Sequence, residues 1–167
     1  MSLIARVLAA LEAHGAKGAL IGGSALAVHG VARSTLDMDV LTTDASVLQA
    51  PFAASLGLGA KIQRGDVDDP LVGVVRIEEG DEIVDVIVGG LSWMKAIVDR
   101  ASAHRVPPDD VPTVEAADLI LLKLYAGGPQ DLLDVRLLVA ARPEVAAVVE
   151  ERIKALPREA QERWTNP

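Results

Sequence analysis

Two short motifs near the start of the chain restrict its fold more than any other feature. The apolar residues 19–21 run directly into Gly-Gly-Ser at residues 22–24, and Asp-Met-Asp follows at residues 37–39. The first motif predicts a short buried strand that turns sharply at the glycines into a helix. Because side chains alternate faces along a strand, Asp37 and Asp39 are expected on one face, with Cα atoms roughly 6.6 Å apart.

This arrangement suits metal-assisted nucleotide chemistry. Two-metal sites hold their ions about 3.5 to 4 Å apart and clamp the attacking and leaving oxygens of a phosphoryl displacement. Asp37 and Asp39 are therefore candidate metal ligands. A helix N-terminus preceded by glycines presents free N–H groups to a phosphate, which makes Gly22, Gly23 and Ser24 candidate nucleotide-binding residues. Ser24 is also expected to cap the helix that it begins.

The order of these motifs resembles the polymerase-beta-like nucleotidyltransferase superfamily, in which a strand, Gly-Gly-Ser, a helix and a strand bearing Asp-x-Asp follow one another. The segment 22–40 is similar, more specifically, to AbiEii-type abortive-infection toxins. These typically show Gly-Gly, then His-Gly or Tyr-Gly, then Arg-x-Thr, then Asp-x-Asp. The corresponding residues here lie at 22–23, 29–30, 33–35 and 37–39. The resemblance extends over residues 17 to 140.

The resemblance implies an α/β fold of the α+β type: a small mixed, mainly antiparallel sheet with flanking helices and a C-terminal helical subdomain. We expect a nucleotidyltransferase core over residues 1–107 and the helical subdomain over residues 108–167. The implied reaction moves an NMP from an NTP, bound with Mg²⁺ (or Mn²⁺), to an acceptor hydroxyl by in-line attack on the α-phosphorus. The implied role is that of the toxin in a toxin–antitoxin system, with a cognate antitoxin as partner.

Asp85 lies within an otherwise apolar segment, residues 83–88. A buried carboxylate without a partner is unfavourable, so Asp85 requires a cation. One interpretation is a structural pair with Arg or Lys, or an exposed position at a sheet edge. The resemblance instead implies the third carboxylate of a triad with Asp37 and Asp39, which binds metal and helps to take the proton of the acceptor hydroxyl. Arg33 is interpreted as a phosphate ligand through its guanidinium fork, with a solvated or Asp-paired arginine as the alternative.

A second cluster of charged residues follows in the C-terminal third. Lys123 is the only basic residue of the apolar segment 119–125, so its amine should emerge at a cleft or reach solvent. Asp131 follows Pro129, where it complements a helix dipole, and Asp134 lies on the same helix face. The residues alone leave a salt-bridged helix pair and a functional cluster equally open. Lys-Leu, a loop and Asp-x-x-Asp resemble the downstream motif of AbiEii-like toxins, which implies that Lys123 and Asp131 are catalytic. The loop here is shorter and lacks the usual basic residue. This departure from the motif concerns the identity of the acceptor and not the metal core.

Hydrophobic periodicity and turn signals predict the remaining elements. Helices are expected over residues 2–14, from 24 onward, 44–56 with a break at Pro51, 91–102, 115–126, 130–141 and 144–155. Strands are expected over residues 36–41, 60–64, 71–78 and 82–88, with a tight turn at 79–81 and a proline-rich connection at 104–112.

Composition restricts the partners and the compartment. The formal net charge of −8 argues against tight nonspecific binding to nucleic acid, although it leaves a tRNA acceptor open. No apolar run reaches the roughly 18 residues of a membrane span, so we expect no membrane association. There is no cysteine, which excludes disulfides and thiolate metal sites and fits a cytoplasmic protein. The three histidines lack the spacing of metal ligands.

The acceptor is left open among tRNA, a protein and a small molecule such as an aminoglycoside or lincosamide. An antibiotic-modifying enzyme would use the same metal core with a different acceptor pocket. A further alternative, from a different class, is a nucleotide-binding or antitoxin-like module that keeps the fold with weak or no turnover. The complete set of carboxylates, Asp37, Asp39 and Asp85, favours an enzyme over this module.

Overall fold

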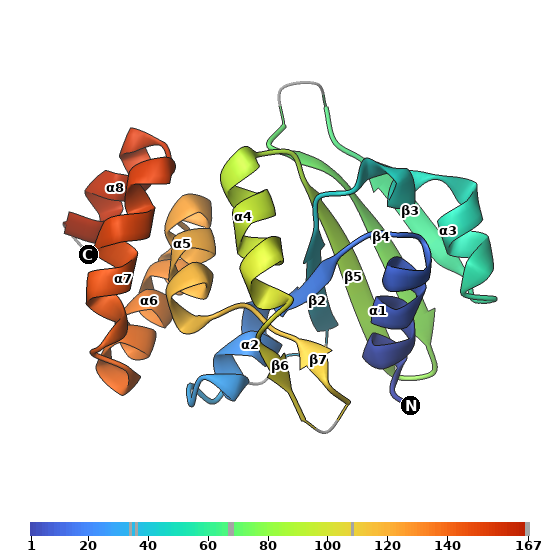
Figure 1. Cartoon of the computed structure of the whole chain (residues 1–167), viewed down its shortest axis with the longest axis horizontal. Coiled ribbons are helices and arrows are strands. Elements are labelled where there is room, and N and C mark those ends of the chain that lie inside the picture. The colour runs from blue at the N-terminus through green and yellow to red at the C-terminus, as the bar shows by residue number, and fades with distance from the viewer. Residues whose placement is uncertain (34, 36, 67–68, 108, 166–167) are drawn as a thin grey trace.

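The computed structural model describes residues 1–33, 35, 37–66, 69–107 and 109–165 (Figure 1). A five-stranded sheet has the order β1-β2-β5-β4-β3. Only the central pair, β2 and β5, is parallel, and the other neighbouring strands are antiparallel. The mixed, mainly antiparallel sheet expected from the sequence is confirmed. The strands are β1 (Gly18–Ile21), β2 (Asp37–Thr42), β3 (Ala60–Arg64), β4 (Leu71–Glu79) and β5 (Glu82–Gly89).

One face of the sheet is covered by α1 (Leu3–Ala13), the 3₁₀ helix η1 (Ala45–Leu48) and α3 (Ala50–Ser55), which lie on the right in Figure 1. The apolar side of α1 is buried, and Ser2 caps its N-terminus. The helix expected over residues 44–56 is divided into η1 and α3, because Gln49 has an extended backbone and Pro51 lies in the first turn of the second helix. The break expected near Pro51 is therefore confirmed.

The other face is covered by α2 (Gly22–Val28) and α4 (Ser92–Ala101), and the C-terminal helices lie beyond them (Figure 1). The C-terminal helices are α5 (Ala116–Ala126), α6 (Pro129–Ala141), α7 (Val145–Arg152), the 3₁₀ helix η2 (Ile153–Ala155) and α8 (Arg158–Thr165). α5 contacts α2, α6, α7 and α8. It is buried on almost every side, as expected for a helix without a polar stripe. α5 is thus the core of the helical part and carries the residues that reach the sheet.

Two local expectations need correction, and a third cannot be compared with the structure. The second helix begins at Gly22 and not at Ser24, because Gly22 makes the turn itself with a φ of +65°. The connection expected at 104–112 contains two short strands, β6 (Arg105–Val106) and β7 (Val111–Pro112), which form a small separate sheet. Leu36, expected at the start of a strand, lies outside the described residues. Of the helices that the structure describes, none has the length and apolar character needed to cross a membrane.

Candidate active site

The carboxylates of the two central strands share one face of the sheet. Asp39 on β2 is directly opposite Asp85 on β5, and Asp37 is opposite Ile83. Side chains opposite each other on neighbouring strands project from the same face, as do residues two apart on one strand. Asp37, Asp39 and Asp85 therefore project from the same side, near the end of β1 where Ile21 pairs with Asp39.

The glycine turn after β1 lies directly against Asp39. A Cβ atom added to Gly22 would be 2.1 Å from Asp39 Oδ2, and the positive φ of Gly22 also disfavours any larger residue. A Cβ atom on Gly23 would be 3.0 Å from Thr35 Cγ2, which is tight but less severe. Gly22 therefore lets the backbone approach the carboxylate closely, which fixes Asp39 from one side.

A cleft of about 360 Å³ opens beside this turn. Its lining includes six of the residues singled out from the sequence: Gly22, Gly23, Arg33, Asp39, Lys123 and Asp131. Ile87 on β5 and Leu119, Leu122 and Ala126 on α5 form an apolar wall. Asp37, Asp85 and Ser24 are not among the residues that line it. The structure thus brings the two halves of the sequence together at one cleft, although Lys123 and Asp131 lie far downstream of Asp39.

The two cations of the cleft are held by one buried carboxylate. Lys123 Nζ lies 2.7 Å from Asp134 Oδ2 and 3.0 Å from Asp131 Oδ1, and Arg33 Nη1 lies 2.6 Å from Asp134 Oδ2. The Gln130 side chain donates to the other oxygen of Asp134 at 3.0 Å. The Asp134 side chain is only 1% exposed. Arg33 and Lys123 are therefore both ion-paired and cleft-lining, and their functional roles stay predictions.

Burial alone would raise the pKa of Asp134. Hydrogen bonds from Lys123 and Gln130 and the charges of Lys123 and Arg33 outweigh it and lower the pKa below the ordinary value. Asp134 therefore stays ionised and keeps both cations in place.

The carboxylates on the sheet have the opposite electrostatic character. Burial raises the pKa of Asp39, and the nearby charges of Asp85 and Asp37 raise it further, while Lys123 and Arg33 lower it. Burial also raises the pKa of Asp85, Arg76 opposes this, and the charges of Asp37 and Glu78 add to it. Like charges close together favour the neutral form unless a cation intervenes. The row of carboxylates thus has more negative charge than its surroundings compensate.

Arg76 on β4 is a charged residue of the site that the sequence patterns did not single out. It is directly opposite Asp85 in the antiparallel pair of β4 and β5. Its Nη2 donates to Asp37 Oδ2 at 2.5 Å, and its Nε lies 3.4 Å from Asp85 Oδ1. The signal was available, because the tight turn that pairs Glu79 with Glu82 also sets Arg76 opposite Asp85.

Asp37, Asp39 and Asp85 offer the kind of oxygen ligand that a divalent ion needs. Mg²⁺ prefers carboxylate oxygens, and Asp85 Oδ1 is buried with no hydrogen-bond partner among the described residues. As the side chains lie, however, no three His, Cys, Asp or Glu residues of the described chain are close enough to hold a metal ion. The triad expected from the sequence shares a face without converging, because Arg76 pairs with Asp37 and approaches Asp85. The three carboxylates fit the ion in their chemistry and in the face that they share, but their side chains do not converge while the guanidinium of Arg76 lies beside them.

Ser24 is not the helix cap that the sequence suggested. The N-cap position belongs to Ile21, and Ser24 is the third residue of α2. The reason is the left-handed conformation of Gly22, which starts the helix two residues earlier. Thr35 makes a local hydrogen bond, from its hydroxyl to the backbone oxygen of Asp37 at 2.9 Å.

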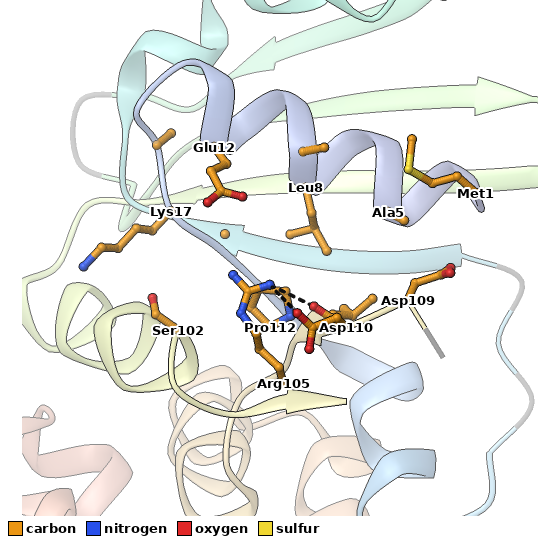
Figure 2. A pocket seen from close by; sticks show the side chains of 14 residues that line it. Met1, Ala5, Leu8, Glu12, Lys17, Ser102, Arg105, Asp109, Asp110 and Pro112 are labelled. Atoms are coloured by element: carbon orange, nitrogen blue, oxygen red, sulfur yellow. Dashed lines mark hydrogen bonds and ion pairs between the residues drawn. The ribbon is translucent and has the colours of Figure 1, made fainter. Parts of the chain in front are cut away.

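A second cavity, of about 380 Å³, lies between α1 and the connection that joins β6 to β7 (Figure 2). Leu8 and Glu12 of α1 border it, and Arg105 donates to Asp110 on its far side. None of the site residues named from the sequence lines this cavity. Six of the candidate residues line the cleft beside Asp39, and none lines this second cavity.

No protein-family model and no curated protein sequence matches the chain. Solved structures do match. The solution structure of the antibiotic-resistance factor ANT(2'')-Ia has a TM-score of 0.54 and 17% sequence identity, covering 98% of this chain and 92% of that chain. The crystal structure of ANT(2'')-Ia in complex with adenylyl-2''-tobramycin has a TM-score of 0.52 and 18% identity, covering 97% of each chain.

The crystal structure of JHP933 from Helicobacter pylori has a TM-score of 0.50 and 14% identity, covering 96% of this chain and 88% of that chain. At these identities the similarity concerns the fold, and it extends over nearly the whole length of both proteins. This chain shares the fold of these three solved structures.

Proposed function

We propose that this protein is a nucleotidyltransferase, which moves an NMP from an NTP to an acceptor hydroxyl with Mg²⁺ or Mn²⁺. The observation that carries the proposal is the composition of the cleft. Asp39 and the glycine turn form one side, and the cations Arg33 and Lys123 approach from elsewhere in the chain. A triphosphate needs both elements, because its charge must be neutralised and its reacting phosphorus must lie near carboxylate-bound metal.

The triphosphate would bind between the glycine turn and the two cations. The guanidinium of Arg33 can bind phosphate oxygens with two parallel hydrogen bonds, and Lys123 acts as a compact charge. Asp134 holds both groups, so they are oriented before the nucleotide arrives. Asp131 accepts from Lys123 and limits where the ammonium can point. Gly22 and Gly23 line the cleft, and Gly22 lets the turn pack directly against Asp39.

Asp37, Asp39 and Asp85 are the residues that would hold the divalent ions, which when bound neutralise charge at the α-phosphate. The acceptor oxygen attacks the α-phosphorus, the bond to the bridging oxygen breaks, and pyrophosphate leaves. The hydroxyl proton passes to a carboxylate oxygen of Asp85.

Two acceptor classes are supported by different observations. The AbiEii-like motif at residues 22–40 supports a toxin, with a cognate antitoxin as partner and tRNA or protein as acceptor. The fold similarity to ANT(2'')-Ia, which is described as an antibiotic-resistance factor, supports a small-molecule acceptor. The formal charge of −8 favours a small or cationic acceptor over an extended nucleic acid.

Transfer of label is the direct test. The purified protein is incubated with each NTP carrying ³²P at the α-phosphate, with Mg²⁺ or Mn²⁺, and with tRNA, aminoglycosides or no added acceptor. Label should move to one acceptor class from the α-labelled and not from the γ-labelled nucleotide. Neither transfer nor NTP binding at millimolar concentration would contradict the proposal. Binding without transfer to any acceptor would favour the inactive nucleotide-binding module.

A further inference from the structure

Arg76 occupies a position that a structural ion pair does not explain. Asp39, Asp85 and Arg76 form one row across three neighbouring strands on the same face of the sheet. The guanidinium donates to Asp37 in the adjacent row and lies 3.7 Å from Glu78 Oε1 on its own strand. One cation therefore serves three carboxylates, two of which are the candidate metal ligands Asp37 and Asp85.

The contact with Asp85 is incomplete. Arg76 Nε and Asp85 Oδ1 are 3.4 Å apart, and both atoms are buried without a hydrogen-bond partner among the described residues. A pair kept for stability would satisfy these atoms, because unsatisfied buried polar groups are costly. The carboxylate is thus near a cation without being fully bound by it, which leaves Asp85 Oδ1 available to another ligand.

We propose that Arg76 is a positioning residue that sets the affinity of this site for divalent ions. It neutralises Asp37 and Asp85 in the nucleotide-free protein, and it must release Asp37 before that carboxylate can bind metal. The inference rests on the proposed function, because it assigns these carboxylates to metal. Arginine does not deprotonate in proteins, so only competition by another cation can displace it.

Glu78 gives the guanidinium a partner after this release. It lies on the same strand two residues away, its side chain is 46% exposed, and it is already within 4 Å of Arg76 Nε. The exchange from Asp37 to Glu78 needs a side-chain rotation and no movement of the strand. Arg76 therefore acts as a competitor of the metal that stays charge-paired throughout.

Mn²⁺ alone is the probe, counted by the electron paramagnetic resonance signal of the free ion, so no nucleotide or acceptor is needed. Arg76→Gln should bind Mn²⁺ about ten-fold tighter than the wild type, because a unit positive charge next to the ion is removed. Arg76→Lys keeps the charge without the fork and should lie between the two. Arg105→Gln is the matched control, since Arg105 is similarly exposed and pairs with Asp110 away from the cleft (Figure 2). It should leave the affinity unchanged.

Thermal melting separates this role from a structural one. Without metal, Arg76→Gln should melt below the wild type, because Asp37 and Asp85 lose their counter-charge, and Mn²⁺ should raise its melting temperature more than that of the wild type. A structural pair predicts the same Mn²⁺ shift in both proteins. The double variant Arg76→Gln/Asp39→Asn should lose the gain in affinity, which assigns the ion to this site.

Equal Mn²⁺ affinity in wild type and Arg76→Gln would overturn the inference and leave the proposed function standing. Tighter binding that persists in the double variant would also overturn it, because the ion would then lie elsewhere. Mn²⁺ binding by neither protein would overturn the inference as well, whereas the proposed function, in which the metal can arrive with the NTP, is decided by label transfer.

Discussion

Asp134 on α6 is more deeply buried than Asp39 or Asp85 on the sheet, yet its pKa is lowered and theirs are raised. The difference lies in the donors. Lys123, Arg33 and Gln130 all reach Asp134, whereas several carboxylates on the sheet share Arg76. The negative charge of Asp134 is therefore balanced by nearby cations, whereas the combined charge of the carboxylates on the sheet is balanced only in part.

This comparison indicates that the carboxylates along the cleft have two different roles, one structural and one chemical. A fully compensated carboxylate acts as a support, because its charge is already used in holding other side chains. An under-compensated carboxylate retains affinity for a further cation. We therefore expect Asp134 to matter for the architecture of the cleft and Asp39 to matter for its chemistry, and the following variants separate the two.

The largest expected effect is on transfer by Asp39→Asn. Loss of a central metal ligand should reduce the transfer rate about a thousand-fold, roughly 4 kcal/mol of transition-state stabilisation. The melting temperature should hold or rise, because one of several like charges is removed. Rates are measured with α-labelled NTP. Asp99→Asn is the control, because Asp99 pairs with Lys17 and Lys95 away from the cleft, and it should transfer at the wild-type rate. Transfer by Asp39→Asn at the wild-type rate would contradict the chemical role that we expect for Asp39.

Asp134→Asn should instead reduce stability. Removing the charge that Lys123 and Arg33 share should cost about 3 kcal/mol in the free energy of unfolding, because breaking a buried pair leaves its partners uncompensated. Urea denaturation measures it. Asp110→Asn removes an exposed carboxylate paired with Arg105 and should cost less than about 0.5 kcal/mol. If the two variants cost the same, Asp134 is not the support inferred here.

Lys123→Met tests the residue that both pairs with the structural carboxylate Asp134 and lines the cleft. Methionine keeps the apolar stem within α5 and removes the charge at the cleft. Transfer should fall about 30-fold, roughly 2 kcal/mol, through the lost phosphate contact. Stability should fall less than in Asp134→Asn, since Arg33 and Gln130 still bind Asp134. Lys95→Met changes an exposed lysine of α4 and serves as the control. Full transfer by folded Lys123→Met would leave only the salt-bridge role.

The smallest effect is a difference in pH dependence. The raised pKa of Asp39 means that the native state binds more protons than the unfolded state between the ordinary value of 3.8 and the folded value. The contribution of Asp39 to stability therefore falls as pH rises through that window. Asp134 behaves oppositely: its contribution is present above 3.8 and is lost as pH falls through its lowered pKa. Urea denaturation is measured across this pH range. Asp39→Asn should remove the loss of stability that comes with rising pH, and Asp134→Asn should remove the loss that comes with falling pH. Identical pH profiles for both variants would contradict the assignment.

The sheet was largely predictable from sequence because its signals are local. Alternating apolar residues gave β3, β4 and β5 within one residue at each end, and the turn at Gly80 fixed the β4–β5 hairpin. The Asp-x-Asp spacing predicted a shared face for Asp37 and Asp39 without any tertiary information. The short strands β6 and β7 gave no such signal, because two residues are too few to show a periodicity.

The contacts that complete the cleft were not predictable in the same way. Nothing local to Arg33 indicates that Asp134 will accept its guanidinium, and Ser24 lost its capping role to the conformation of Gly22. The pairing of Arg76 with Asp85 lies between these cases. Its register follows from the hairpin, but its consequence for Asp37 depends on how β2 docks beside β5.

The contact between Arg33 and Asp134 joins residues separated by 101 positions. During synthesis, the strands and glycines that contribute Asp39 leave the ribosome long before α6 does. Domains gain long-range contacts only when both partners are available, so the nascent chain cannot hold its two cleft cations in place until α6 has emerged. The triphosphate binding that we propose should therefore arise only after α6 has emerged, and translation products that end before α6 should lack it.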